Sequence, residues 1–282
     1  MRARLPHWAA EFVMFVLKQG WACLFGICLL GAILLTRAIW QPDWALHRYD
    51  FLVIVAVGLQ ALFLALKLES WDEARVIALF HLTGTAMELF KVQAGSWSYP
   101  EPGVLKLMGV PLFSGFMYAS VGSYMARVIR LFDMQFAPYP PFWSTLILAS
   151  AIYVNFFAHH FLPDIRLALF AATLILFLRT RIWFRIAENW YWMPLPLAAF
   201  LSSFFLWLAE NIGTMTGTWL YAGQNPFEQV SFAKMGSWYL LLYVSFVTVT
   251  LVFRSALHRG PWVTEPRARP ATASPDQTPP AG

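Results

Sequence analysis

Charged side chains are scarce in this sequence. Asp, Glu, Lys and Arg make up 12% of its 282 residues, about half the share that is usual for a soluble domain. Hydrophobic residues make up 59%, so the composition excludes an ordinary soluble protein and predicts a membrane protein with several spans. The net charge of +5 does not indicate a nucleic-acid partner, because Lys and Arg lie in short clusters between apolar runs.

Cysteine is nearly absent as well. Cys23 and Cys28 lie five residues apart in the first apolar run, a spacing that matches neither a redox motif nor a zinc motif, so we expect small core residues. The sequence also lacks an Asp-Asp-x-x-Asp motif, which argues against a magnesium-dependent prenyl transferase that uses diphosphate substrates. No motif in the chain requires a cofactor.

Long apolar runs are what the chain has instead. A helix needs about 20 mostly apolar residues to cross the hydrocarbon layer, and eight runs come near that length. They predict an all-α fold, a polytopic membrane helix bundle of about eight transmembrane helices within residues 1–259, with residues 7–19 as a candidate interfacial helix. Residues 260–282 are rich in proline and small polar residues and predict a disordered tail. The predicted spans are 20–38, 50–67, 74–92, 107–130, 142–161, 165–180, 194–215 and 233–255.

The distribution of Lys and Arg predicts how these spans are oriented. Cytoplasmic loops of membrane proteins carry the excess of basic residues. With the N-terminus inside, thirteen Lys and Arg residues fall on the inner side and six on the outer side, Lys18 being ambiguous. The sequence therefore predicts an even number of spans, with both termini in the cytoplasm.

One phrase occurs twice. Glu88 is followed, after six residues, by Gly-Ser-Trp-Ser-Tyr at 95–99, and Glu210 is followed in the same way by Gly-Thr-Trp-Leu-Tyr at 217–221. Each copy closes a predicted span, and the two spans are four apart in order. We therefore expect two parallel four-helix repeats, about 12–130 and 142–255, related by an axis near the membrane normal. The alternative is chance similarity in an aromatic-rich sequence.

Polar residues follow one face of each helix that ends in this phrase. The first face carries His81, Gly84, Thr85 and Glu88, and the second carries Ser203, Glu210, Thr214 and Gly217. Exposing a charge to lipid costs at least about 2.5 kcal/mol, so we expect both faces to turn inward and line one pocket. The alternative is that the glutamates bind neighbouring helices and the aromatics form an interface belt. The candidate catalytic residues are Glu88, Glu210, His81 and Asn211, and the candidate pocket residues are Trp97, Tyr99, Trp219, Tyr221 and Asn155.

A third polar cluster lies at the end of the predicted span 142–161. His159, His160 and Asp164 are of the residue types that bind zinc and other divalent ions, so a divalent metal is a candidate cofactor. Adjacent histidines on a helix point in different directions, however. The alternative is an ion pair between Asp164 and Arg166 with packed histidines.

Two family resemblances follow from these residues. Ala209-Glu-Asn-Ile-Gly-Thr-Met-Thr-Gly217 with Tyr221 resembles a signature of the membrane carotenoid-synthesis family that includes carotenoid hydratases, although that family's Pro-Phe-Gly after Thr-Gly is missing. Nearly the whole chain, with both copies of the phrase, Asn155, the His159/His160 pair and Asp164/Arg166, more closely resembles domain-of-unknown-function family 817. That family consists of bacterial integral membrane proteins without an established activity, so the resemblance implies a bacterial inner membrane.

Three catalytic or transport functions fit these patterns. The first is an enzyme that protonates a double bond of a polyprenyl or carotenoid-like lipid, which needs a carboxylic acid kept neutral by burial and aromatic faces that stabilise the cation. The second is a transporter for small solutes or one coupled to protons, with paired glutamates. The third is a metal-dependent lipid hydrolase built from His81 and the third cluster. A purely structural membrane protein is a fourth reading, and the first is the one we favour.

Overall fold

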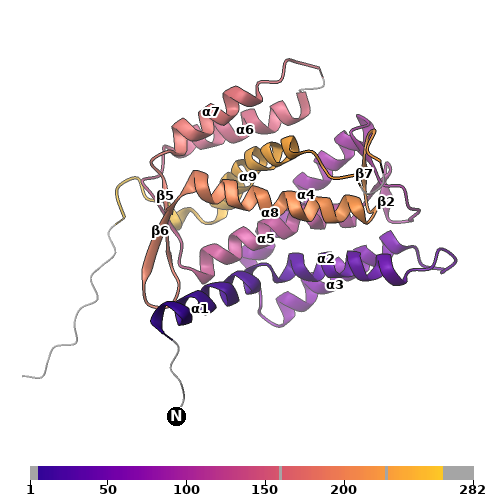
Figure 1. Ribbon diagram of the computed structural model, residues 1–282, viewed down its shortest axis with the longest axis horizontal. Coiled ribbons are helices and arrows are strands. Elements are labelled where there is room, and N and C mark those ends of the chain that lie inside the picture. The colour runs from indigo at the N-terminus through magenta and orange to yellow at the C-terminus, as the bar shows by residue number, and fades with distance from the viewer. Residues whose placement is uncertain (1–5, 159–160, 226–227, 263–282) are drawn as a thin grey trace, which may run out of the picture.

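Helices dominate the part of the chain that the computed structural model describes, residues 6–158, 161–225 and 228–262. Within it, nine α-helices form a bundle, and most of them run along the long axis of the molecule (Figure 1). They are α1 (His7–Ala22), α2 (Leu24–Ile39), α3 (Arg48–Ala65), α4 (Trp71–Gln93), α5 (Phe113–Leu131), α6 (Phe142–Ala158), α7 (Arg166–Phe177), α8 (Leu195–Met215) and α9 (Phe232–Val252).

The predicted spans overlap these helices, with two differences. The first span, 20–38, begins inside α1 and continues in α2, and the two helices meet at a bend of 63°. The span 107–130 begins too early, because β2 (Lys106–Leu107) and β3 (Val110–Pro111) form a hairpin before α5. Met108 and Gly109 make its turn at φ of 48° and 85°, and positive φ at both central residues is typical of a two-residue hairpin.

The expectation of an all-α fold misses seven short strands among the described residues. β1 (Trp97–Ser98) pairs with β7 (Leu220–Tyr221), while β4 (Gln135–Ala137), β5 (Arg181–Arg185) and β6 (Trp190–Pro194) form an antiparallel sheet. Aromatic and β-branched residues favour such strands, but each segment is too short to register as an apolar run. The β1–β7 pair lies at the right-hand end of the bundle in Figure 1 and the three-stranded sheet at the left-hand end.

Length and composition identify a smaller set of membrane spans than the eight predicted. Of the described helices, α3, α8 and α9 are long and apolar enough to cross a membrane, and the bent pair α1 and α2 would make a fourth span. Helices α6 and α7 are apolar but have only 17 and 12 residues. These apolar helices are compatible with a membrane protein.

Helices α4 and α5 pack closely because small residues line their contact. On α5, buried small residues recur every three or four positions, which places them on one face. A Cβ added at Gly122 would lie 2.7 Å from the Phe80 ring, and one at Gly84 of α4 would lie 2.6 Å from Tyr118. The close approach brings the Tyr118 side chain against α4. The small residues on α5 are Gly115, Ala119, Gly122 and Ala126.

Two arginines in the last two turns of α5 form ion pairs. Arg127 is fully buried and contacts Glu69 at 2.6 Å, while Arg130 contacts Glu73 at 3.0 Å. Both arginines belong to the thirteen inner cations of the sequence-based count. Because acidic partners account for their positions, they carry less weight as signals of orientation than cations in loops.

Candidate functional site

The carboxylate of Glu88 is held by three neutral donors. The Tyr118 hydroxyl, on α5, donates to Oε1 at 2.7 Å. The Trp97 indole N–H and the Tyr99 hydroxyl donate to Oε2 at 2.7 and 2.9 Å. Glu88 is only 2% exposed, so these bonds replace the water that a carboxylate would otherwise bind.

Glu210 of α8 is held in a related way. The Tyr221 hydroxyl donates to its Oε1 and the Trp238 indole N–H, on α9, donates to its Oε2. Tyr99 and Tyr221 each follow the glutamate that they bind by eleven residues. The bond from tyrosine to glutamate is therefore the same in both copies of the phrase.

The β1–β7 pair brings the two copies into contact. Trp97 lies opposite Tyr221 and Ser98 lies opposite Leu220, and the ring centroids of Trp97 and Tyr221 are 5.8 Å apart. The two glutamates lie within electrostatic reach of each other. The structure thus gathers two carboxylates, Trp97 and both tyrosines of the phrase at one end of the bundle.

The two phenols outside the helices stay protonated at neutral pH. Burial, together with the neighbouring Glu88, raises the pKa of Tyr99 well above its ordinary value. Burial and the neighbouring Glu210 do the same to the pKa of Tyr221. Both hydroxyls therefore remain donors to the carboxylates.

The second tryptophan of the phrase has a different place from the first. Trp219 makes no hydrogen bond to Glu210 among the described contacts, and its ring packs against Gly213 so closely that an added Cβ would lie 1.8 Å from it. Trp238 of α9 supplies the indole donor instead. The two copies are therefore alike in backbone and tyrosine but not in tryptophan.

His81 and Asn211 lie near the glutamates in sequence but contact other groups. The His81 ring packs against the Phe116 ring at 4.3 Å, and its buried Nδ1 has no hydrogen-bond partner among the described residues. The Asn211 side chain donates to the Trp207 carbonyl at 2.7 Å and accepts from the Val230 amide at 2.9 Å. Asn211 thus ties α8 to the segment before α9.

The third cluster closes the turn between α6 and α7. Asn155 donates to Asp164 at 3.1 Å and accepts from the Ile165 amide. Asp164 also pairs with Arg166 at 3.0 Å, which confirms the predicted ion pair. His159 and His160 lie outside the described residues. In the described part of the chain, no group of three or more His, Cys, Asp or Glu residues could hold a metal ion, and no cofactor is indicated.

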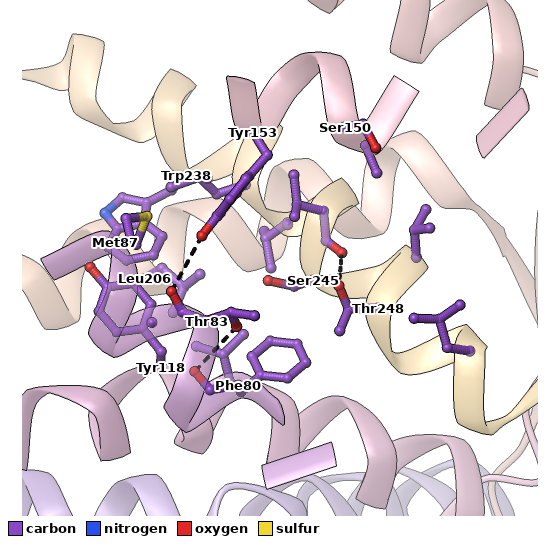
Figure 2. Close-up of a pocket in the computed structure, with 18 of the residues that line it drawn as sticks. Phe80, Thr83, Met87, Tyr118, Ser150, Tyr153, Leu206, Trp238, Ser245 and Thr248 are labelled. Atoms are coloured by element: carbon purple, nitrogen blue, oxygen red, sulfur yellow. Dashed lines mark hydrogen bonds between the residues drawn. The ribbon is translucent and has the colours of Figure 1, made fainter. Parts of the chain in front are cut away.

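A mostly apolar cavity of about 250 Å³ lies among α4, α5, α6, α8 and α9 (Figure 2). Tyr118 and Trp238 both line it, and each donates to one of the glutamates. Tyr153 reaches from α6 to the Thr83 carbonyl, to which it donates at 3.3 Å. The cavity therefore adjoins the carboxylate pair through one phenol and one indole.

The sequence patterns do not single out Tyr118 or Trp238. Each lies in the second turn of the helix that follows a copy of the phrase, outside the repeated residues. A single aromatic residue carries no signal in a chain that is 17% aromatic. The signal that could identify them is their shared position, in the helix that follows each glutamate.

Arg48 is a second residue whose role the patterns miss. It is buried at 4% exposure, pairs with Glu101 at 2.7 Å, and donates to the Thr218 hydroxyl at 3.3 Å. The neighbouring Tyr49 donates to the Thr218 carbonyl, and Asp50 accepts from two backbone amides of the loop before β2. The start of α3 therefore holds together the chain that follows β1 and the second copy of the phrase.

Comparisons with known proteins give a family match and no activity. The model of a family described as protein of unknown function (DUF817) matches residues 11–246. An uncharacterized protein YoaT of Bacillus subtilis (strain 168) is 44% identical over 240 residues, which cover 85% of this chain and 90% of that protein. No solved structure matches.

Proposed function

This chain belongs to the DUF817 family, and we propose that it is a membrane enzyme that transfers a proton to a polyprenyl or carotenoid-like lipid. One observation carries the proposal. The apolar cavity is lined by Tyr118 and Trp238, and these two residues bind Glu88 and Glu210. A hydrocarbon chain in the cavity would therefore lie beside a pair of buried carboxylates.

The carboxylate pair has the parts that alkene protonation needs. One glutamate, in its acid form, gives its proton to a carbon of the double bond, so that a C–H bond forms and a cation remains on the neighbouring carbon. The rings of Tyr118 and Trp238 and the second glutamate stabilise this cation. Water then adds to the cation and gives a proton to the glutamate that was ionised in the first step, or that glutamate removes a proton from a neighbouring carbon, and either route restores its acid form. Trp97, Tyr99 and Tyr221 are positioning residues, because they hold the carboxylates.

We propose that the bundle lies in a bacterial inner membrane with eight spans, α1 and α2 forming one bent span. In support, the start of α1 and the end of α9 lie at the same end of the bundle in Figure 1. The excess of Lys and Arg on the predicted inner side supports an orientation with both termini in the cytoplasm. The repeated phrase and the pairing of β1 with β7 support two parallel repeats.

The cavity favours this proposal over a transporter for small polar solutes. Paired carboxylates would also suit proton-coupled transport. The wall of the cavity, however, consists mainly of Leu, Val, Met and Phe side chains, and a polar solute would lose its water there without gaining enough partners.

Lipid analysis of a deletion strain tests the proposed activity. The strain is complemented with the wild-type protein, Glu88→Gln, Glu210→Gln or the control Glu228→Gln, whose side chain is exposed and contacts Asn225. We expect the deletion and both site variants to accumulate the same lipid and lack its product, while the wild type and the control restore the profile. Identical lipid profiles in all strains, with all variants present in the membrane fraction, would exclude the activity.

A further inference from the structure

Three basic side chains gather where the cavity approaches the β1–β7 end of the bundle. Lys91 belongs to α4, Lys234 to α9, and Arg166 begins α7. Lys91 and Lys234 each lie four residues, about one helical turn, from a cavity residue, Met87 and Trp238 respectively. Lys234 and Arg166 both lie within electrostatic reach of Lys91.

The burial of these cations is costly. Lys91 is 2% exposed, and its Nζ lies 4.2 Å from the centre of the Phe156 ring. The Nζ of Lys234, which is half-buried, lies 3.8 Å from the centre of the Tyr221 ring. Contact with ring faces offsets part of the lost hydration. Like charges that are close together raise the cost of burial further, so an anion at this point would be stabilising.

Acidic side chains lie close to the same three cations and offset part of their charge. Asp164 pairs with Arg166 at 3.0 Å, and Glu210 lies within electrostatic reach of Lys234. Glu88, the partner of Glu210, is a further acid at this point. In the proposed reaction one of the two glutamates is in its acid form, so the three cations outnumber the ionised carboxylates and the net charge beside the cavity is positive. The excess charge and the apolar cavity together fit an amphiphile with an anionic head.

The volume of the cavity limits the length of chain that it can hold. An apolar cavity of roughly 150 Å³ holds one benzene molecule, so by proportion about 250 Å³ holds roughly ten carbon atoms. Leu146 and Leu251 line the cavity and are 36% and 42% exposed. A longer chain could continue past these two residues into the surrounding lipid.

We propose that Lys91, Lys234 and Arg166 bind the phosphate of a single-chain phosphate monoester whose first ten or so carbons occupy the cavity. A phosphate monoester carries about −1.5 to −2 charges and three acceptor oxygens, which suits several convergent cations better than a carboxylate does. This inference rests on the proposed function in using the same cavity for the substrate chain. It places Glu88 and Glu210 at the junction of head and chain.

Titration calorimetry of the purified full-length protein in a nonionic detergent tests the site. The probes are geranyl phosphate, geraniol and inorganic phosphate. We expect geranyl phosphate to bind at least about tenfold more tightly than either other probe, and Lys91→Gln and Lys234→Gln each to weaken it about tenfold or more. Lys67→Gln, an exposed lysine at the other end of the bundle, should bind like the wild type. Thermal melts check that each variant is folded, and Lys234→Gln alone suffices if Lys91→Gln does not fold.

Two results would overturn the proposal. One is unchanged binding of geranyl phosphate to a folded lysine variant. The other is equal binding of geranyl phosphate and inorganic phosphate, which would assign the cluster to free phosphate. The same titration on the Glu88→Gln/Glu210→Gln double variant separates this inference from the proposed reaction: binding that persists there, with a lipid profile insensitive to both glutamates, would sink the reaction and leave the binding site.

Discussion

Ser98 and Leu220 lie opposite each other in the β1–β7 pair, and they hold the same position in the two copies of the repeated phrase. In an antiparallel pair, a local two-fold axis passes between residues that lie opposite each other. Pairing of equivalent positions is therefore the register that a two-fold relation between the copies requires. It places Tyr99 and Tyr221, and the glutamates that they bind, around one centre.

Replacing Tyr118 with Phe should destabilise the protein. The change removes the hydroxyl that donates to Glu88 Oε1 at 2.7 Å, and a buried acceptor that loses its partner costs about 1–3 kcal/mol. Tyr153→Phe is the matched control, because its hydroxyl donates at 3.3 Å to a backbone carbonyl. Reversible unfolding in mixed detergent measures both variants. Equal free energies of unfolding for the two variants would mean that the bond from Tyr118 to Glu88 contributes no more to stability than the bond from Tyr153 to a backbone carbonyl.

Replacing Gly213 with Ala should destabilise the protein more than the addition of one methyl group usually does. The new Cβ would lie 1.8 Å from the Trp219 ring, so the ring must move, and overpacking of this kind costs about 1–3 kcal/mol. At Gly58 in α3 nothing lies within 4 Å of an added Cβ, and Gly58→Ala should gain up to about 1 kcal/mol of helix propensity. Thermal melts of the two variants should shift in opposite directions; a shared direction would contradict the packing described for Trp219.

The ion pair of Arg48 and Glu101 should show a measurable coupling energy. Because Arg48 is 4% exposed and Glu101 is 22% exposed, we expect Arg48→Met, Glu101→Gln and the double variant to give a coupling of about 1–2 kcal/mol. The exposed pair Asp72 and Arg75, in contact at 2.9 Å, should give about 0.5 kcal/mol or less in the same cycle. Similar coupling in the two cycles would show that burial adds nothing to the Arg48 contact.

Stability should fall as the pH rises above about 10. The pKa values of Tyr99 and Tyr221 are raised in the folded protein, whereas unfolded phenols ionise near pH 10. Above that pH the unfolded chain binds fewer protons than the folded chain, so each phenol removes about 1.4 kcal/mol per pH unit up to its folded pKa. Unfolding curves followed at increasing pH measure this decline, which should be shallower in Tyr221→Phe. Phenolate absorbance that appears at the ordinary pKa for every tyrosine of the folded protein would refute the shift.

Chemical labelling should place the β1–β7 end outside the cell. In a protein with Cys23→Ser and Cys28→Ser, single cysteines are introduced at Val104, which is 79% exposed between β1 and β2, and at Asp72, which is exposed at the start of α4. A maleimide that cannot cross membranes should label Val104→Cys in intact cells and Asp72→Cys only after permeabilisation. The reverse pattern would invert the proposed orientation.

The length of the apolar runs predicts most of the helices, because a helix that crosses a membrane is mostly apolar along its whole length. The helices predicted at 194–215 and 233–255 are found at 195–215 and 232–252. The length of apolar runs does not reveal the strands, since β1 and β7 have two residues each and Ser98 pairs with Leu220, 122 residues later in the sequence. No local pattern encodes such a pairing.

The repeated phrase identifies part of the candidate site from the sequence, and the rest of the site consists of residues outside the phrase. Glu88 and Glu210, with their tyrosines, stand out because the same spacing occurs twice. The distribution of basic residues along the sequence assigns Arg48, at the start of the predicted span 50–67, to the outer side. A charge count cannot distinguish its buried ion pair from a cation in a loop. Its partner, Glu101, is distant in sequence and can be assigned only from the fold.

The close contact between α4 and α5 also determines how the cavity can change shape. With Gly84 against Tyr118 and Gly122 against Phe80, these two helices have no space in which to slide past each other. We therefore expect the cavity wall that they form to resist deformation. A ligand that needs more room must gain it by displacing α6, α8 or α9, so the width of the cavity depends on how firmly those helices are held by their surroundings.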